Sequence, residues 1–143
     1  MREKQLVLLI DDDIDMVEVM KIVLESSGYS VSSAYDPETG FVKAKTEKPD
    51  AIVLDVMFGA AEKVRGFDTA VRIRKDKEIA SIPILMITSV NEKIPGMGFS
   101  SETDGEYMPV DGFINKPAQP EELIKTIKEL LEKKTSKWVN WAS

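Results

Sequence analysis

Four short segments of the sequence that predict strands each end in residues that could bind a metal ion or a phosphate group. These residues are Asp11, Asp12, Asp55, Thr88 and Lys116. Clustered carboxylates repel one another unless a cation neutralises them. Mg²⁺ suits such a site because it accepts a few carboxylates and keeps water and phosphate oxygens as its other ligands. The lysine and the hydroxyl group would complement the oxygens of a phosphoryl group.

The segments that must position these residues alternate between two patterns. Continuous apolar runs predict strands at residues 6–10, 51–54 and 84–87, and shorter, more polar strands are predicted at 30–34 and 112–115. Apolar residues at helical spacing predict helices at 14–27, at 37–48, around 67–74 and at 120–134. This alternation implies a parallel sheet with helices on both faces, and ligands of such sheets bind outside the carboxyl ends of the strands. The polar residues are therefore expected at one edge of the sheet.

The composition excludes several other kinds of chemistry. The chain has no cysteine, so it has no thiol nucleophile, disulfide or zinc-thiolate site. It has no histidine, which excludes Ser-His-Asp catalysis and a histidine phosphoryl carrier. The net charge of −6, from 19 basic and 25 acidic residues, argues against direct nucleic-acid binding, which usually requires a basic surface.

The length and the hydropathy pattern predict one soluble domain. No apolar run approaches the roughly 20 residues of a membrane span, and the first run is too short for the core of a signal peptide. We therefore expect a cytoplasmic protein without a membrane segment. Its 143 residues divide into one domain, 1–134, and a C-terminal tail, 135–143.

Four sequence motifs, taken in order, resemble the receiver domain of two-component response regulators. The motifs are Leu-Leu-Ile-Asp-Asp-Asp at 8–13, Ile-Val-Leu-Asp-Val-Met at 52–57, Ile-Pro-Ile-Leu-Met-Ile-Thr-Ser at 82–89 and Phe-Ile-Asn-Lys-Pro at 113–117. The resemblance covers about residues 4–134. It implies a flavodoxin-like, doubly wound sheet of five parallel strands. Because only residues 135–143 follow the last predicted helix, we expect a domain that signals without an attached enzyme or DNA-binding module.

The resemblance also implies a role for each polar residue. Asp55 would be the phospho-acceptor, a carboxylate nucleophile that becomes an aspartyl phosphate. Asp12 would bind Mg²⁺ directly and Asp11 through a water molecule, while Asp55 and the backbone carbonyl of Met57 would complete the protein's share of the ligands. Lys116 would bind the phosphoryl oxygens.

The resemblance further implies a conformational switch and two kinds of protein partner. Thr88 would move to bond the new phosphate, and Phe113 occupies the position of an aromatic switch residue, although it could equally be permanent core. The phosphoryl donor would be a phosphohistidine on a sensor histidine kinase or a histidine phosphotransfer protein. Output would pass by contact to a downstream protein whose identity the sequence does not give.

Several positions depart from the family pattern. Gly59 stands where a proline is usual, and the gaps from Asp55 to Gly66 and from Thr88 to Phe113 are longer than usual. Residues 91–111 contain glycines and prolines without an apolar stripe, so we expect the fourth helix to be shortened or replaced by a loop. The apolar residues Met57 and Val90 offer no hydrogen bond to an attacking water, which predicts slow hydrolysis of the phosphoryl group.

Three alternative functions follow from these departures and from the fold. A degenerate receiver would act as a protein-interaction module without phosphorylation. A phosphatase that forms an aspartyl phosphate would need a second acid near its nucleophile, but residue 57 is methionine. A flavin carrier would need a phosphate-binding loop after the first strand, where the aspartates at 11–13 would repel a phosphate.

Two apolar features lie outside the expected core. Trp138 and Trp141 are expected beyond the last helix, where they either fold back onto the domain or form an interaction surface, for example for a homodimer. Val19 and Ile22 lie off the buried stripe of the first helix. They are either a partner surface or isolated exposed residues of the kind that most proteins have.

Overall fold

The computed structural model describes residues 4–56, 69–88, 110–115 and 119–142, with the backbone alone at 56, 88, 113, 115 and 133–142. The strands are β1 (Leu6–Ile10), β2 (Ser30–Ala34), β3 (Ala51–Val56), β4 (Ile84–Thr88) and β5 (Gly112–Asn115). The helices are α1 (Ile14–Ser26), α2 (Pro37–Glu47) and α4 (Pro120–Ala142), and residues 69–75 are also helical.

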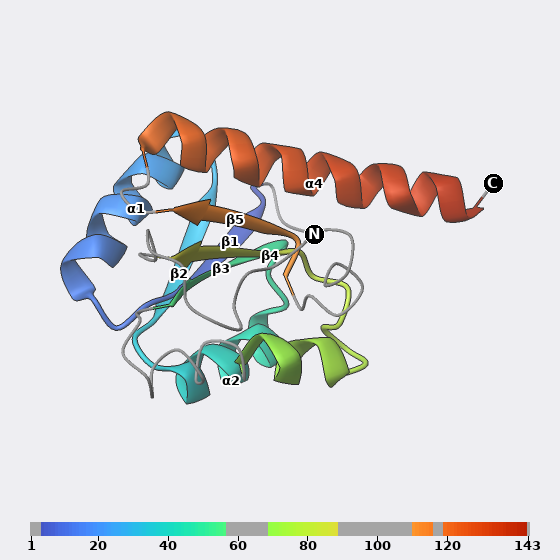
Figure 1. Cartoon of the computed structure of the whole chain (residues 1–143), viewed down its shortest axis with the longest axis horizontal. Coiled ribbons are helices and arrows are strands. Elements are labelled where there is room, and N and C mark those ends of the chain that lie inside the picture. The colour runs from blue at the N-terminus through green and yellow to red at the C-terminus, as the bar shows by residue number, and fades with distance from the viewer. Residues whose placement is uncertain (1–3, 57–68, 89–109, 116–118, 143) are drawn as a thin grey trace, which may run out of the picture.

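The five strands form one parallel sheet in the order β2-β1-β3-β4-β5. Figure 1 shows α1 and α4 on one face of this sheet, and α2 with the helical residues 69–75 on the other. The predicted fold class, a doubly wound five-stranded parallel sheet, is therefore confirmed. The prediction of a shortened fourth helix concerns residues that lie outside the described part of the chain.

Alternation along the strands divides the core into two halves. Leu9 of β1 and Val53 of β3 point to the α1 and α4 side, where they pack with Val17 and Leu24. Their neighbours along the strands point to the α2 side and pack with the small residue Ala44 and with helical residues 69–75. These neighbours are Leu8, Ile10, Ile52 and Leu54. Continuous apolar runs are typical of parallel strands that are covered on both faces.

Two helices begin as the sequence predicts. Asp36 is the N-cap of α2, with Pro37 as the first residue of the helix. The Asp36 carboxylate accepts hydrogen bonds from the backbone N–H and the hydroxyl of Thr39, both 2.8 Å long. These bonds lower the pKa of Asp36. Asp13 caps α1 in the same way, since its Oδ1 accepts from the N–H of Met16 at 3.1 Å.

The start of β4 is fixed by a charged pair that joins three segments. Arg74 donates to the carbonyls of Ala80 (2.9 Å) and Ile82 (2.7 Å), and it also contacts the carboxylate of Asp111. Asp111 accepts a hydrogen bond of 2.8 Å from the N–H of Ile84. This arrangement sets the register of β4 and β5, and therefore where both strands end.

Strand β2 forms one edge of the sheet, and its open side is partly occupied. The Asp11 N–H donates to the carbonyl of Ala34, which therefore points toward β1. By alternation, the carbonyl of Ser33 points away from the sheet. This carbonyl accepts a hydrogen bond of 2.6 Å from Lys43 Nζ of α2.

The predicted end of the last helix is wrong. The sequence predicts that this helix ends near Lys134, but α4 continues to Ala142. Residues 135–142 contain no glycine or proline that would stop a helix. Trp138 and Trp141 therefore lie within α4 and not in a tail beyond it, and Figure 1 shows this end of α4 extending past the sheet.

Candidate functional site

The candidate site lies at the carboxyl ends of the two central strands. The last residues paired between β1 and β3 are Ile10 and Leu54. Asp11 and Asp55 come directly after these partners, one on each strand. The parallel register therefore brings the two carboxylates to neighbouring positions at the same edge of the sheet.

Asp11 is held firmly at this position. Only 3% of the residue is exposed. Its N–H donates to the carbonyl of Ala34 at 3.0 Å, and its Oδ1 accepts from the N–H of Asp13 at 2.9 Å. Its Oδ2 is also buried. The turn after β1 is thus built around the Asp11 side chain, whereas Asp12 between these residues is exposed to solvent.

Asp55 lies inside β3, one residue before its end. The sequence predicts that this strand ends at residue 54, but the backbone stays in the ladder through Val56, which pairs with Thr88. Both carboxylate oxygens of Asp55 are buried, although the residue as a whole is partly exposed. Because Asp55 is the last but one residue of a central strand, its backbone is held in place by the ladder, as a nucleophile or a metal ligand requires.

The carboxylates fit a site for a small divalent cation. In the described part of the chain, no group of three acidic side chains is arranged to hold a metal ion without other ligands. Mg²⁺ does not require such a group, because it usually binds one or two carboxylates together with water and phosphate oxygens. Asp11 and Asp55, on adjacent strands and with buried oxygens, match this demand, and the exposed Asp12 lies beside them in sequence.

The remaining predicted residues are described only in part. The backbone of Thr88 ends β4, beside β3 and β5, and pairs with Val56 and Asn115. Phe113 lies in β5 and pairs with Met86. The roles predicted for Met57 and Lys116 concern residues outside the described part of the chain, as does the role predicted for Val90. The structure therefore brings Asp11, Asp55 and the end of β4 to one edge of the sheet.

Comparison with known proteins identifies the family. The family model of the response regulator receiver domain matches residues 7–128. The chain belongs to this family. Receiver domains are the signalling domains of two-component systems, and their partners are histidine kinases or phosphotransfer proteins.

The most similar relatives include proteins of two lengths. The alkaline phosphatase synthesis transcriptional regulatory protein PhoP of Bacillus subtilis is 35% identical over 127 residues, which are 89% of this chain and 48% of PhoP. The chain thus spans about half the length of this relative. Protein PilH of Pseudomonas aeruginosa is 27% identical over 128 residues, and the match covers 87% of this chain and 96% of PilH.

Solved structures agree with the fold. The chemotaxis protein CheY4 of Vibrio cholerae has a TM-score of 0.73 and 28% identity, and the match covers 89% of this chain and 98% of CheY4. A CheY-like receiver domain protein of Methanospirillum hungatei has a TM-score of 0.76 over 94% of this chain, at 22% identity. Among the described helices, none combines the length and the apolarity that a membrane span needs.

Proposed function

We propose that this receiver domain accepts a phosphoryl group on Asp55 in a Mg²⁺-dependent reaction. The observation that carries the proposal is the pair of carboxylates, Asp11 and Asp55, that directly follows the last paired residues of β1 and β3. The membership of the receiver family supports the same reaction, because the donor partners of this family carry phosphohistidine.

The transfer step needs one nucleophile and a leaving group. A carboxylate oxygen of Asp55 attacks the phosphorus of the donor phosphohistidine, a P–O bond forms, and the P–N bond to the imidazole breaks. The imidazole leaves with the electron pair of that bond and takes up a proton. Bound Mg²⁺ would neutralise the charge of the phosphoryl oxygens in this transfer.

The chain's own residues supply position and charge. Asp11 and Asp12 would hold the cation with Asp55 and the Met57 carbonyl. Lys116 would bind phosphoryl oxygens with its ammonium group. The backbone of Asp55 lies in the ladder of β3, so the strand positions the nucleophile before the transfer begins.

After the transfer, we propose that Thr88 and Phe113 take part in the conformational switch. Thr88 lies on β4, which is next to β3 on the side away from β1, and Phe113 lies on β5, the strand beyond β4. Phosphorylation can shift a two-state equilibrium only through contacts that differ between the states. The backbone of Thr88 ends β4, the strand next to β3, and we propose that its hydroxyl group makes such a contact with a phosphoryl group on Asp55.

The test is intact-mass spectrometry after incubation with acetyl phosphate, with and without Mg²⁺. The wild-type chain should gain the mass of one phosphoryl group only with Mg²⁺, and Asp55→Asn should gain none because the nucleophile is absent. Asp15→Asn is a matched control, since it removes an exposed carboxylate from the first turn of α1. It should be phosphorylated as the wild type is.

A folded wild-type chain that gains no mass from acetyl phosphate would next be offered a panel of phosphohistidine donors. Absence of an adduct from every donor would contradict the proposal and favour the phosphorylation-independent interaction module. An adduct that persists in Asp55→Asn would place the acceptor at another residue.

A further inference from the structure

Glycine at position 40 is unusual for its place in the structure. Gly40 lies in the interior of α2 and is buried. Glycine is among the poorest helix formers, and alanine at an interior helix position is ordinarily more stable. A helix with a buried glycine therefore needs another reason for it, and close approach of a neighbouring element is one such reason.

The neighbouring element is the end of β1. A Cβ atom added to Gly40 would lie 2.6 Å from Cδ1, 2.8 Å from Cγ1 and 3.0 Å from Cγ2 of Ile10. Both branches of the isoleucine side chain are in contact, so a rotation about χ1 exchanges one clash for another. Rotation is also restricted because Ile10 is β-branched and only 3% exposed. A side chain at residue 40 must therefore displace Ile10 as a whole, or displace α2.

Displacement of Ile10 would reach the candidate site directly. Ile10 is the last residue of β1 and is bonded to Asp11. Its register partner is Leu54, which is bonded to Asp55. The Asp11 N–H also donates a hydrogen bond of 3.0 Å to the Ala34 carbonyl, so the turn after β1 cannot move without changing its contact with β2.

From this geometry we infer that Gly40 is a positioning residue for the acidic site. The missing side chain lets the end of β1 pack against α2, and this contact sets where Asp11 and Asp12 lie relative to Asp55. Gly40 touches neither metal nor phosphate, and it acts only through Ile10. The inference rests on the proposed function, since it assigns Gly40 to the geometry of the same Mg²⁺ site.

The experiment compares Gly40→Ala with the double variant Gly40→Ala/Ile10→Ala. Mg²⁺ affinity is measured by isothermal titration calorimetry, the thermal midpoint by circular dichroism, and the backbone amide shifts of residues 10–13 by NMR without metal. Gly40→Ala should weaken Mg²⁺ binding on the order of 10-fold, the scale known for residues that orient metal ligands. It should also shift the amides of residues 10–13.

The double variant should recover most of the Mg²⁺ affinity, because alanine at residue 10 lacks all three atoms that a Cβ at residue 40 would meet. Gly112→Ala is the matched control. A Cβ at residue 112 would meet Leu85 Cδ1 at 3.5 Å, which is an ordinary contact, and residue 112 lies at the start of β5, away from the site. This control should keep the wild-type Mg²⁺ affinity and the wild-type amide shifts at 10–13.

A lower thermal midpoint in Gly40→Ala with unchanged Mg²⁺ affinity and unchanged amide shifts would overturn the inference and leave only a packing role. If Gly40→Ala does not fold, a folded double variant with wild-type affinity supports the coupling, and an unfolded one overturns it. If the wild type binds no Mg²⁺, the proposed function fails. The amide shifts of the metal-free protein then decide alone whether Gly40 positions the turn.

Discussion

The two faces of the sheet are covered by layers that are held in different ways. The aliphatic layer consists of α1 and α4, whose buried side chains are large and apolar, among them Leu24, Leu123 and Ile127. The charged layer consists of α2 and residues 69–82, where Gly40 and Ala44 let α2 lie close to the strands. Small residues bring α2 near to the sheet but bury little apolar area, and the large buried side chains of this layer, Ile73, Ile79 and Ile82, come from the other segment. Contacts at the rim therefore gain importance for α2.

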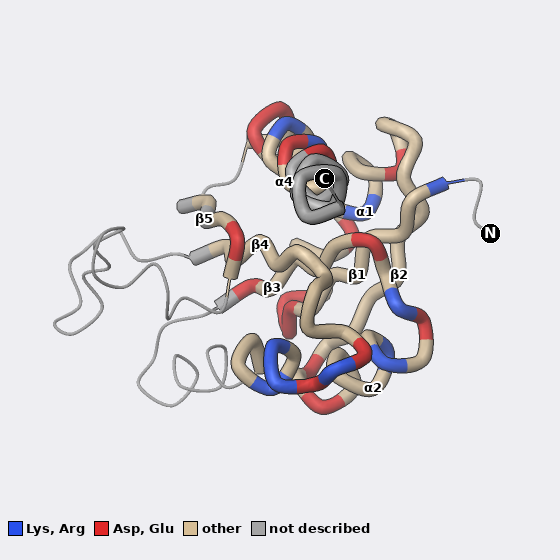
Figure 2. Tube along the Cα trace, turned by 90° about the vertical axis from the view of Figure 1, so that its right-hand side faces the viewer, with Lys and Arg blue, Asp and Glu red and all other residues tan. Residues whose placement is uncertain are grey.

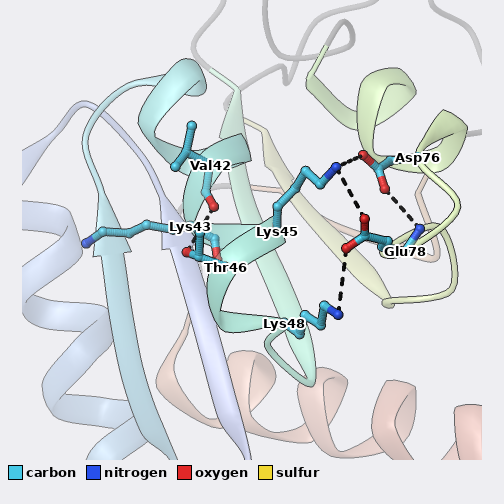
Figure 3. A network of polar contacts seen from close by, with 7 residues as sticks. All are labelled: Val42, Lys43, Lys45, Thr46, Lys48, Asp76 and Glu78. Atoms are coloured by element: carbon cyan, nitrogen blue, oxygen red, sulfur yellow. Dashed lines mark hydrogen bonds and ion pairs between the residues drawn. The ribbon is translucent and has the colours of Figure 1, made fainter.

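Ionic contacts join α2 to the segment after residue 75. Lys45 Nζ lies 2.9 Å from an Asp76 carboxylate oxygen and 3.7 Å from Glu78, and Lys48 lies 3.7 Å from Glu78 (Figure 3). The hydrogen bond and the charge of Asp76 raise the pKa of Lys45, and the same contact lowers the pKa of Asp76. Figure 2 shows the blue and red segments of this layer side by side.

A second contact joins α2 to residues 69–75. The Arg72 guanidinium lies 3.1 Å from a Glu38 carboxylate oxygen, and its Cζ atom is 4.1 Å from the centre of the Phe41 ring. Exposed ion pairs of this kind contribute little one by one, and salt screens them. The stability contributed by the charged layer should therefore depend on salt and pH, whereas that contributed by the aliphatic layer should depend mainly on side-chain volume.

The largest expected effect is the loss of volume in the aliphatic layer. Ile127→Ala removes a side chain that is fully buried between α4 and the sheet, and it should lower the free energy of unfolding by about 2–5 kcal/mol. Urea unfolding measures this loss, and the difference from wild type should not depend on the NaCl concentration. The neighbouring exposed residue gives the control, since Lys128→Ala should change stability by less than about 0.5 kcal/mol. A loss in Ile127→Ala that is no larger than that of this control would contradict the description of the layer.

An intermediate effect is expected where the two helices end. Gly28 follows α1 with a φ of 97°, and Lys48 follows α2 with a φ of 47°. Gly28→Ala should lower the free energy of unfolding by about 1 kcal/mol, because alanine is strained at a positive φ. A steric clash does not add to this loss, since a Cβ at residue 28 meets nothing within 4 Å. Lys48→Gly should relieve strain at the end of α2, and it serves as the opposite case. Equal losses in both variants, measured by urea unfolding, would refute this account.

The smallest effect is expected from the ion pair of the charged layer. The Asp76 pKa is lower than its usual 3.8, so its contribution to stability is present above this pH and is lost as the pH falls through the folded-state pKa. The Lys45 pKa is raised above 10.5, so its contribution is present below that pH and is lost as the pH rises through the folded-state pKa.

Asp76→Asn should therefore lower the urea midpoint slightly at pH 7, and the difference from wild type should shrink in acid below the folded-state pKa. High salt should shrink it as well. Glu18→Gln removes an exposed carboxylate from α1 and is the control, which should show no such pH dependence. A difference between Asp76→Asn and wild type that stays constant with pH and salt would show that the pair does not stabilise the charged layer.

The sequence predicts best what local pattern determines. The bounds of β1 agree with its apolar run, those of β2 agree with the predicted strand at 30–34, and α2 begins at residue 37 as predicted. The meeting of Asp11 with Asp55 could be predicted because parallel strands end at the same edge of the sheet. The family resemblance adds roles to these positions that residue type alone does not give.

The sequence predicts less well what depends on distant partners. The pairing of Lys45 with Asp76 depends on how α2 lies against the segment after residue 75, and several other acids are equally available in the sequence. The end of α4 was missed because the paired lysines at 133–134 resemble a last turn, although nothing after them stops the helix. Gly40 gave one available signal, a glycine inside a predicted helix, which points to close packing.

The hydrogen bond from Lys43 to the Ser33 carbonyl also bears on how copies of the chain meet. An exposed edge of a parallel sheet presents unpaired backbone groups on which a strand of another molecule can assemble. On the open side of β2, one of these acceptors is taken by an ammonium group of the same chain, which also brings a positive charge to the edge. This edge therefore resists edge-to-edge aggregation, so that β2 can remain short and rich in serine without recruiting a foreign strand.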